Sequence, residues 1–149
     1  MNSSCKWDDL FSTIFSFISM VTMLKAWKSE SKKECQAKIE LLNGVMSDVK
    51  LVKSKIQSLK RKRLLSRNKA RKTAVKQVRV LEKIVNKIKF EDRHLRGMLS
   101  YAIKSLNVVN TDNHTSVLVL LDDVERALED IIRYIQNECD RIERELGFP

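Results

Sequence analysis

The sequence predicts an all-α protein, an antiparallel bundle of three long helices plus an N-terminal hydrophobic helix. Glycine and proline are scarce, with three Gly and one Pro in 149 residues, so few turns can be built. Apolar residues recur every three or four positions over most of the chain, which is the period of one helix face. Charged residues make up 32% of the chain and aromatics only 6%, a composition typical of bundles and coiled coils.

The first element is an uncharged stretch over 10–24, LFSTIFSFISMVTML, which allows four interpretations. Its mostly apolar circumference suits a fourth core helix. It is shorter than the roughly 20 residues of a membrane span, but Trp7 and Trp27 bracket it as interfacial tryptophans do. Its serines share one face, which suits a helix lying on a membrane. A cleaved signal is disfavoured because acids outnumber bases before the stretch.

Two predictions follow for the N-terminal part. Residues 1–28 form a hydrophobic helix, either a membrane anchor or a fourth bundle helix, and 29–149 form the helical-bundle or coiled-coil domain. Lysines after the stretch put the N-terminus outside and the bundle in the cytoplasm if a membrane is crossed. The candidate membrane-contacting residues are Trp7, Leu10, Phe11, Ile14, Phe15, Phe17, Ile18, Val21, Leu24 and Trp27.

The first long helix is predicted over about 30–65. Ser31 and Glu34 have the spacing of a capping box at its start. The apolar seam that defines its buried face consists of Leu42, Val45, Val49, Val52, Ile56 and Leu59.

A strongly basic corner follows, in the segment 60–76. A helix–helix turn is expected at Ser66–Asn68, with one unbroken helix as the alternative. The corner is either a solvated turn or a site for the phosphates of nucleic acid or lipid headgroups, and it also resembles a nuclear localisation signal. No aromatic lies between Lys28 and Lys89, so bases would find no stacking platform. The candidate phosphate- or nucleic-acid-contacting residues are Lys60, Arg61, Lys62, Arg63, Arg67, Lys69, Arg71, Lys72 and Lys76.

The second long helix is predicted over about 69–108. Asp92 interrupts its seam, either as a buried residue that sets the register or as a point of local exposure. The other seam positions are all apolar: Ala74, Val78, Leu81, Val85, Ile88, Leu95, Leu99, Ala102, Leu106 and Val109.

A polar loop, NVVNTDNHTS, precedes the last helix, predicted over about 116–146 and stopped at Gly147. The seam of this helix includes Val117, Leu121, Val124, Leu128, Ile131, Ile135 and Ile142. Three seams joined by two connections predict an up-down-up bundle, with a shape like that of a spectrin repeat.

The charge of the chain is uneven. Residues 1–116 carry an excess of 15 positive charges, whereas 117–149 carry an excess of five negative charges. One interpretation is that the acidic last helix packs against basic neighbours. The other is a basic surface that binds phosphates.

No catalytic, metal or cofactor motif is present, and we expect a protein that is not an enzyme. Cys5, Cys35 and Cys139 form no CxxC pair, so a structural zinc site is not expected. Their odd number and wide spacing suit a reducing compartment, with a single Cys35–Cys139 disulfide as the alternative. Glu91 and His94 have the spacing of half a di-iron motif, but the second half is missing.

The sequence therefore favours a non-enzymatic protein–protein interaction protein, associated with a membrane through its N-terminal helix. We expect a helical protein partner or self-association, contact with an anionic membrane, no cofactor and no small-molecule substrate. The first alternative is a basic helical nucleic-acid-binding protein that uses 60–76, with nuclear localisation. The second is a membrane-perturbing bundle.

Overall fold

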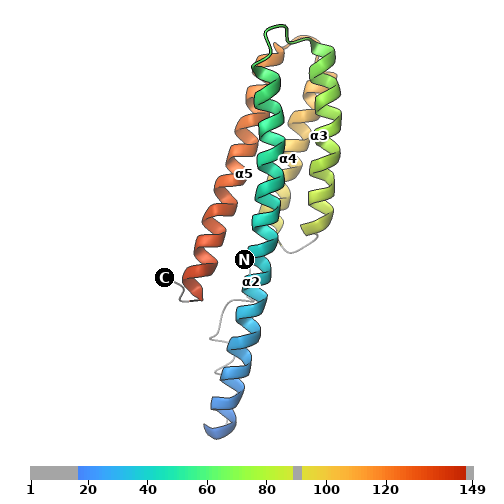
Figure 1. Ribbon diagram of the computed structural model, residues 1–149. Coiled ribbons are helices and arrows are strands. Elements are labelled where there is room, and N and C mark those ends of the chain that lie inside the picture. The colour runs from blue at the N-terminus through green and yellow to red at the C-terminus, as the bar shows by residue number, and fades with distance from the viewer. Residues whose placement is uncertain (1–16, 89–91, 147–149) are drawn as a thin grey trace.

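The chain folds as an all-helical bundle (Figure 1). The computed structural model describes residues 17–88 and 92–146, with side chains from residue 31 onward. No strand occurs among these residues, which confirms the predicted all-α bundle. The helices are α2 (Phe17–Lys60), α3 (Arg67–Ile88), α4 (Arg93–Thr111) and α5 (Val117–Glu145).

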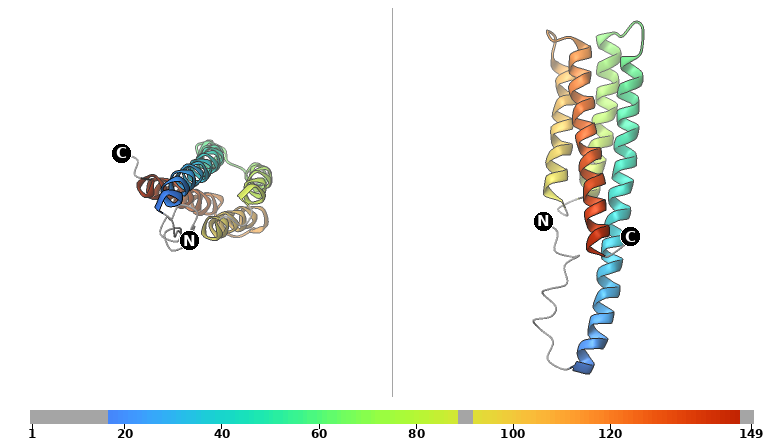
Figure 2. Two further views of the ribbon diagram at one scale, coloured as in Figure 1. Left: turned by 90° about the horizontal axis from the view of Figure 1, so that it is seen from below. Right: turned by 90° about the vertical axis from the view of Figure 1, so that its left-hand side faces the viewer.

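Successive helices run antiparallel and occupy the corners of a square (Figure 2). Helix α5 packs against α2 and α4, and α3 packs against α4 and, less extensively, against α2. Helices α3 and α5 are therefore diagonal to each other. The predicted count of three long helices with a spectrin-repeat-like shape is wrong, because the described residues form four helices.

The extra helix arises where the predicted 69–108 helix breaks in two. Asp92 has an extended backbone, with φ −143° and ψ 101°, and its side chain accepts a hydrogen bond from the Leu95 amide. This is N-cap geometry, in which a carboxylate satisfies an amide that has no partner within the helix. Asp92 is thus the start of α4, and neither a register-setting residue inside a helix nor a mark of simple exposure.

The predicted seams form the core. Every seam position of α2 between Leu42 and Leu59 is buried, and Val78 and Val85 of α3 are half-buried at its margin. The largest side chains that are fully buried come from all four helices: Leu42, Ile56, Leu81, Ile88, Leu95, Leu99, Leu106, Leu121, Leu128, Ile131, Ile135 and Ile142. Because each seam faces the other three, burial of these side chains is the main stabilising term.

Helix α2 is longer than predicted at its N-terminal end. It passes through Ser31, which is buried, and Glu34, which is exposed, so the predicted capping box is wrong. It also passes without a break through the proposed boundary at 28/29, and the division into two domains stays a prediction. The early part of α2 projects beyond the end of α5 (Figures 1 and 2).

The candidate membrane-contacting residues fall on this end of the chain. Trp7, Leu10, Phe11, Ile14 and Phe15 lie outside the described residues. The others lie on the α2 backbone, and their side chains are outside the described part: Phe17, Ile18, Val21, Leu24 and Trp27. Within the described residues, no helix combines the length and hydrophobicity that a membrane crossing requires.

Candidate functional site

The basic corner lies at the end of the bundle where two loops meet, one over 61–66 and one over 112–116 (Figure 1). Helix α2 ends at Lys60, and α3 begins after Ser66, whose Oγ accepts a 3.1 Å hydrogen bond from the Lys69 amide. The serine side chain thus caps α3. The predicted break between two helices is confirmed, but it lies over 61–66 and not at Ser66–Asn68, because α2 ends five residues earlier than expected and Arg67 and Asn68 already belong to α3. The alternative of one unbroken helix is wrong.

Two arginines of the predicted site hold the neighbouring loop. The Arg67 guanidinium donates to the carbonyl oxygens of Asp112, at 2.7 Å, and Thr115, at 2.9 Å. Arg71 donates to the same Asp112 carbonyl, at 3.4 Å, and to Oδ1 of Asn113. A guanidinium group can bond two loop oxygens at once because its five N–H donors point outward in one plane. These arginines satisfy carbonyls of the loop that joins the end of α4 to the start of α5.

Lys60 is also used inside the fold. Its ammonium pairs with Asp122 and, at 2.5 Å, with Glu125, which also accepts from Gln57 at 2.7 Å. These bonds raise the pKa of Lys60, through Asp122 first, and the bond from Lys60 lowers the pKa of Glu125. With the 3.5 Å pair of Lys53 and Glu129, they join α2 to the acidic helix α5. The predicted packing of the last helix against a basic neighbour is confirmed for α2.

Asp112 organises the loop that the arginines hold. Its Oδ1 accepts from the amides of His114, at 2.7 Å, and Thr115, at 2.8 Å, and its Oδ2 accepts from the Thr115 hydroxyl at 2.8 Å. The Thr115 amide and then the His114 amide are the main causes that lower the Asp112 pKa to about 2. The carboxylate therefore stays charged and holds the turn into α5.

The remaining six cations of the predicted site face solvent. They form no ion pair with any acid in the described part of the chain. The loop also carries Leu64, whose side chain is 85% exposed. The outward set consists of Arg61, Lys62, Arg63, Lys69, Lys72 and Lys76.

The predicted site thus divides into structural and available cations. Three further exposed cations of α3, which the predicted site does not include, continue the series beyond Lys76: Arg79, Lys83 and Lys87. Their spacing of three or four residues was visible in the sequence.

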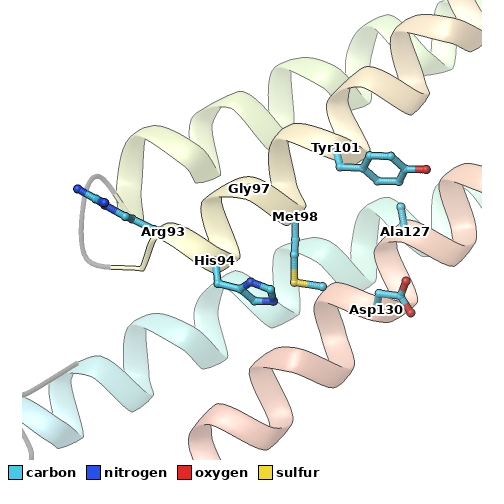
Figure 3. A pocket seen from close by; sticks show the side chains of 7 residues that line it. All are labelled: Arg93, His94, Gly97, Met98, Tyr101, Ala127 and Asp130. Atoms are coloured by element: carbon cyan, nitrogen blue, oxygen red, sulfur yellow. The ribbon is translucent and has the colours of Figure 1, made fainter. Parts of the chain in front are cut away.

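A second surface feature, not selected by sequence reasoning, is a groove between α4 and α5 (Figure 3). Its volume is about 380 Å³. Gly97 leaves it open, since a Cβ at this position would meet no atom within 4 Å. A glycine inside a helix was the one available signal. The lining residues are Arg93, His94, Gly97, Met98, Tyr101, Ala127 and Asp130.

The groove combines an apolar floor with a polar rim. Met98 and Ala127 supply the apolar contacts, and Arg93 of α4 and Asp130 of α5 supply opposite charges. At one end the His94 ring lies 4.7 Å from the ring of Tyr134, whose hydroxyl donates to Asp92 at 2.8 Å. Burial first, and then the bond to Asp92, raises the pKa of Tyr134. This end is therefore fixed in place by contacts between the two helices.

The described residues also bear on two other kinds of site, a metal centre and a disulfide. Among the described residues, no cluster of His, Cys, Asp or Glu could hold a metal ion. Cys139 is a buried free thiol, so the Cys35–Cys139 disulfide is not formed. Burial raises the pKa of this thiol, which favours its neutral form.

Comparison with known proteins identifies no relative: no protein-family model, no curated protein and no solved structure matches the chain.

Proposed function

We propose that this chain is a non-enzymatic interaction protein, a helical bundle associated with a membrane through its apolar N-terminal segment. The observation that carries the proposal is the continuity of α2. One helix runs from Phe17 to Lys60, so the apolar start of α2 and the packed bundle belong to the same rigid element. At 1.5 Å per residue this helix is about 66 Å long.

The direction of α2 supports a definite arrangement. The loops 61–66 and 112–116 lie at the end of the bundle remote from the N-terminal part of α2 (Figure 1). If that part lies at a membrane, the basic corner at the opposite end of the bundle stays accessible to partners. The sequence over 17–24 is uncharged and mostly apolar, and transfer of such a segment from water to a membrane lowers its free energy.

The membrane proposal is tested with full-length variants and neutral vesicles of phosphatidylcholine. We expect Ile18→Asn, Val21→Asn and Leu24→Asn together to abolish sedimentation with the vesicles, because apolar transfer drives it. The control is Leu51→Asn on the same helix, whose side chain is 63% exposed beside the packed bundle. If the triple variant sediments as the wild type does, the membrane proposal is wrong.

The partner in this proposal is an amphipathic helix that docks in the α4–α5 groove. The buried seams are already filled by the bundle itself, so association through vacant seam positions is not available. The groove offers instead Met98 and Ala127 for apolar anchors, and Tyr101, 62% exposed, at its edge. Anchors three or four residues apart on a partner helix fit such a groove.

Self-association, the other kind of partnership that the sequence predicts, would pair this face with the same face of a second copy, and it is tested by sedimentation velocity. Gly97→Trp fills the groove without disturbing the core, since the position is open, and we expect it to lower the dimer fraction. The matched control is Ser54→Trp at an exposed position of α2. A wild type that is monomeric at every concentration would contradict self-association, and equal dimer fractions in the two variants would exclude the groove as its site.

A further inference from the structure

The outward face of α3 is a single row of positive charges. Six exposed cations follow each other at steps of three or four residues, the spacing that keeps side chains on one helix face. They extend over 18 residues of helix, or about 27 Å. Glu82 is the only acid in α3. The row, called here the α3 row, consists of Lys69, Lys72, Lys76, Arg79, Lys83 and Lys87.

The position of α3 in the bundle leaves the α3 row without a bonded acid. One neighbour, α4, contains no Asp or Glu at all. The other neighbour, α2, carries Glu40 and Asp48, but neither pairs with the α3 row, although the Lys87 ammonium reaches α2 beside Gly44. The acidic helix, α5, is diagonal to α3, and its acids pair instead with Lys53 and Lys60 of α2 and with its own arginines. Within the described part of the chain, no cation of the α3 row forms an ion pair.

We propose that the α3 row binds the sugar–phosphate backbone of double-stranded nucleic acid, without regard to base sequence. A straight row of charges matches a stiff, linear polyanion. A duplex carries one negative charge per about 1.7 Å of its axis, so 27 Å offers about 16 phosphates. These phosphates wind around the axis, so the α3 row reaches those on the side of the duplex that it faces, at most one for each cation. The proposal is independent of the membrane association and of the α4–α5 groove.

The same face is poorly suited to the other common polyanion, an anionic bilayer. Helices that lie on membranes present a broad apolar face beside their charges. Among the described side chains of α3, the exposed hydrophobics are Val75, 38% exposed, and Val80, 37% exposed. No aromatic occurs in α3, so bases could not be stacked, and binding would read only the backbone.

The test uses full-length protein, a labelled duplex of about 30 base pairs and fluorescence anisotropy over a range of NaCl concentrations. For the wild type we expect the logarithm of the binding constant to fall with the logarithm of salt concentration, with a slope of roughly −5 from six phosphate contacts. The triple variant Lys72→Gln, Lys76→Gln, Lys83→Gln should reduce that slope by roughly three and weaken binding at least about tenfold at low salt.

A matched triple variant, Lys33→Gln, Lys50→Gln, Lys104→Gln, changes the net charge equally. It removes exposed lysines of α2 and α4 that lie outside the α3 row. We expect its slope to equal that of the wild type. Both triples alter only exposed positions, and circular dichroism checks that each retains its helices. Equal effects of the two triples would overturn the proposal, because net charge alone would then account for binding.

Two further measurements distinguish duplex binding by the α3 row from lipid binding by the same face and from membrane association of the N-terminal segment. If the α3-row variant loses binding to vesicles of phosphatidylcholine and phosphatidylserine but keeps wild-type duplex binding, the face is a lipid site and the proposal is wrong. The N-terminal triple variant, which tests membrane association, should keep the wild-type slope on duplex. The experiments can therefore contradict duplex binding without contradicting membrane association, and the reverse.

Discussion

At the scale of single residues, the stability of the bundle depends on apolar side chains that the other helices enclose. Leu128 is fully buried, whereas Leu51 is 63% exposed on α2. Leu128→Ala should lower the free energy of unfolding by about 2–5 kcal/mol, because it removes buried methyl groups and leaves a cavity. Leu51→Ala should change it by less than about 0.5 kcal/mol. Urea denaturation measures both, and similar values would contradict the assignment of core and surface.

Asp112 gives a residue-scale prediction about pH. Its pKa falls from the ordinary 3.8 to about 2 because the amides of Thr115 and His114 bond its carboxylate. A depressed folded-state pKa means that the charged carboxylate stabilises the folded protein above about pH 4, and that this stabilisation is lost as the pH falls through about 2. Asp112→Asn should therefore be less stable than the wild type at neutral pH.

The difference in unfolding free energy between the wild type and Asp112→Asn should narrow between about pH 4 and pH 2, as measured by urea denaturation. An NMR titration of the Asp112 carboxyl provides the direct measurement. A midpoint near 3.8 would show that the hydrogen bonds to His114 and Thr115 do not hold the carboxylate in solution.

Single residues also show where sequence reasoning succeeds and fails. Buried seam positions could be predicted because burial of apolar side chains imposes their period. The role of Asp92 could not be predicted, because a polar residue in a seam gives the same sequence pattern whether it lies within a helix or caps one. Only the extended backbone and the bond from the Leu95 amide distinguish these cases.

At the scale of elements, Asp92 is the joint between α4 and α5. Its Oδ1 caps α4, and its Oδ2 accepts from the Tyr134 hydroxyl of α5. Asp92→Ala removes both bonds and should cost about 1–3 kcal/mol, from a cap and one hydrogen bond to a charged group. Tyr134→Phe removes only the second and should cost less.

Asp92→Asn is the conservative comparison, since asparagine caps helices as well as aspartate does. It should be more stable than Asp92→Ala. Thermal unfolding followed by circular dichroism ranks the variants. Equal stability of Asp92→Ala and the wild type would mean that the cap contributes nothing to the hairpin of α3 and α4.

The basic corner shows the limit of element-scale prediction. The sequence predicts nine cations at a corner between two helices, but the residue types alone do not reveal which ones face a neighbouring loop. Arg67 and Arg71 bond carbonyls more than 40 positions away in the chain, so their role depends on how α3 and α4 pair. The α3 row depends only on local spacing, and attention to charges as well as apolar residues would have found it.

At the scale of the whole molecule, the number of helices was the main error. A seam over 69–108 has the same period whether it belongs to one long helix or to two that fold back on each other. In the hairpin, the apolar faces of α3 and α4 pack against each other. The bundle is therefore a square of four helices in cross-section and not a triangle of three. The fold class could be predicted from periodicity, and the topology could not.

The square places charge unevenly, and this has a consequence for stability. The five successive pairs of like charges along the α3 row each cost about 0.2–0.5 kcal/mol at low salt, or about 1–2.5 kcal/mol in total. Raising the ionic strength from 0.01 M to 0.1 M shortens the Debye length from about 30 Å to about 10 Å, which weakens this repulsion. The midpoint of thermal unfolding should therefore rise by a few degrees with added NaCl, roughly 4 °C per kcal/mol.

Two triple variants test whether the α3 row causes this rise. In the variant Lys72→Gln, Lys76→Gln, Lys83→Gln, the rise with salt should be smaller than in the control variant Lys33→Gln, Lys50→Gln, Lys104→Gln. Its unfolding midpoint at low salt should also be higher than that of the control. A midpoint that falls with salt would mean that the ion pairs between α2 and α5 outweigh the repulsion along α3.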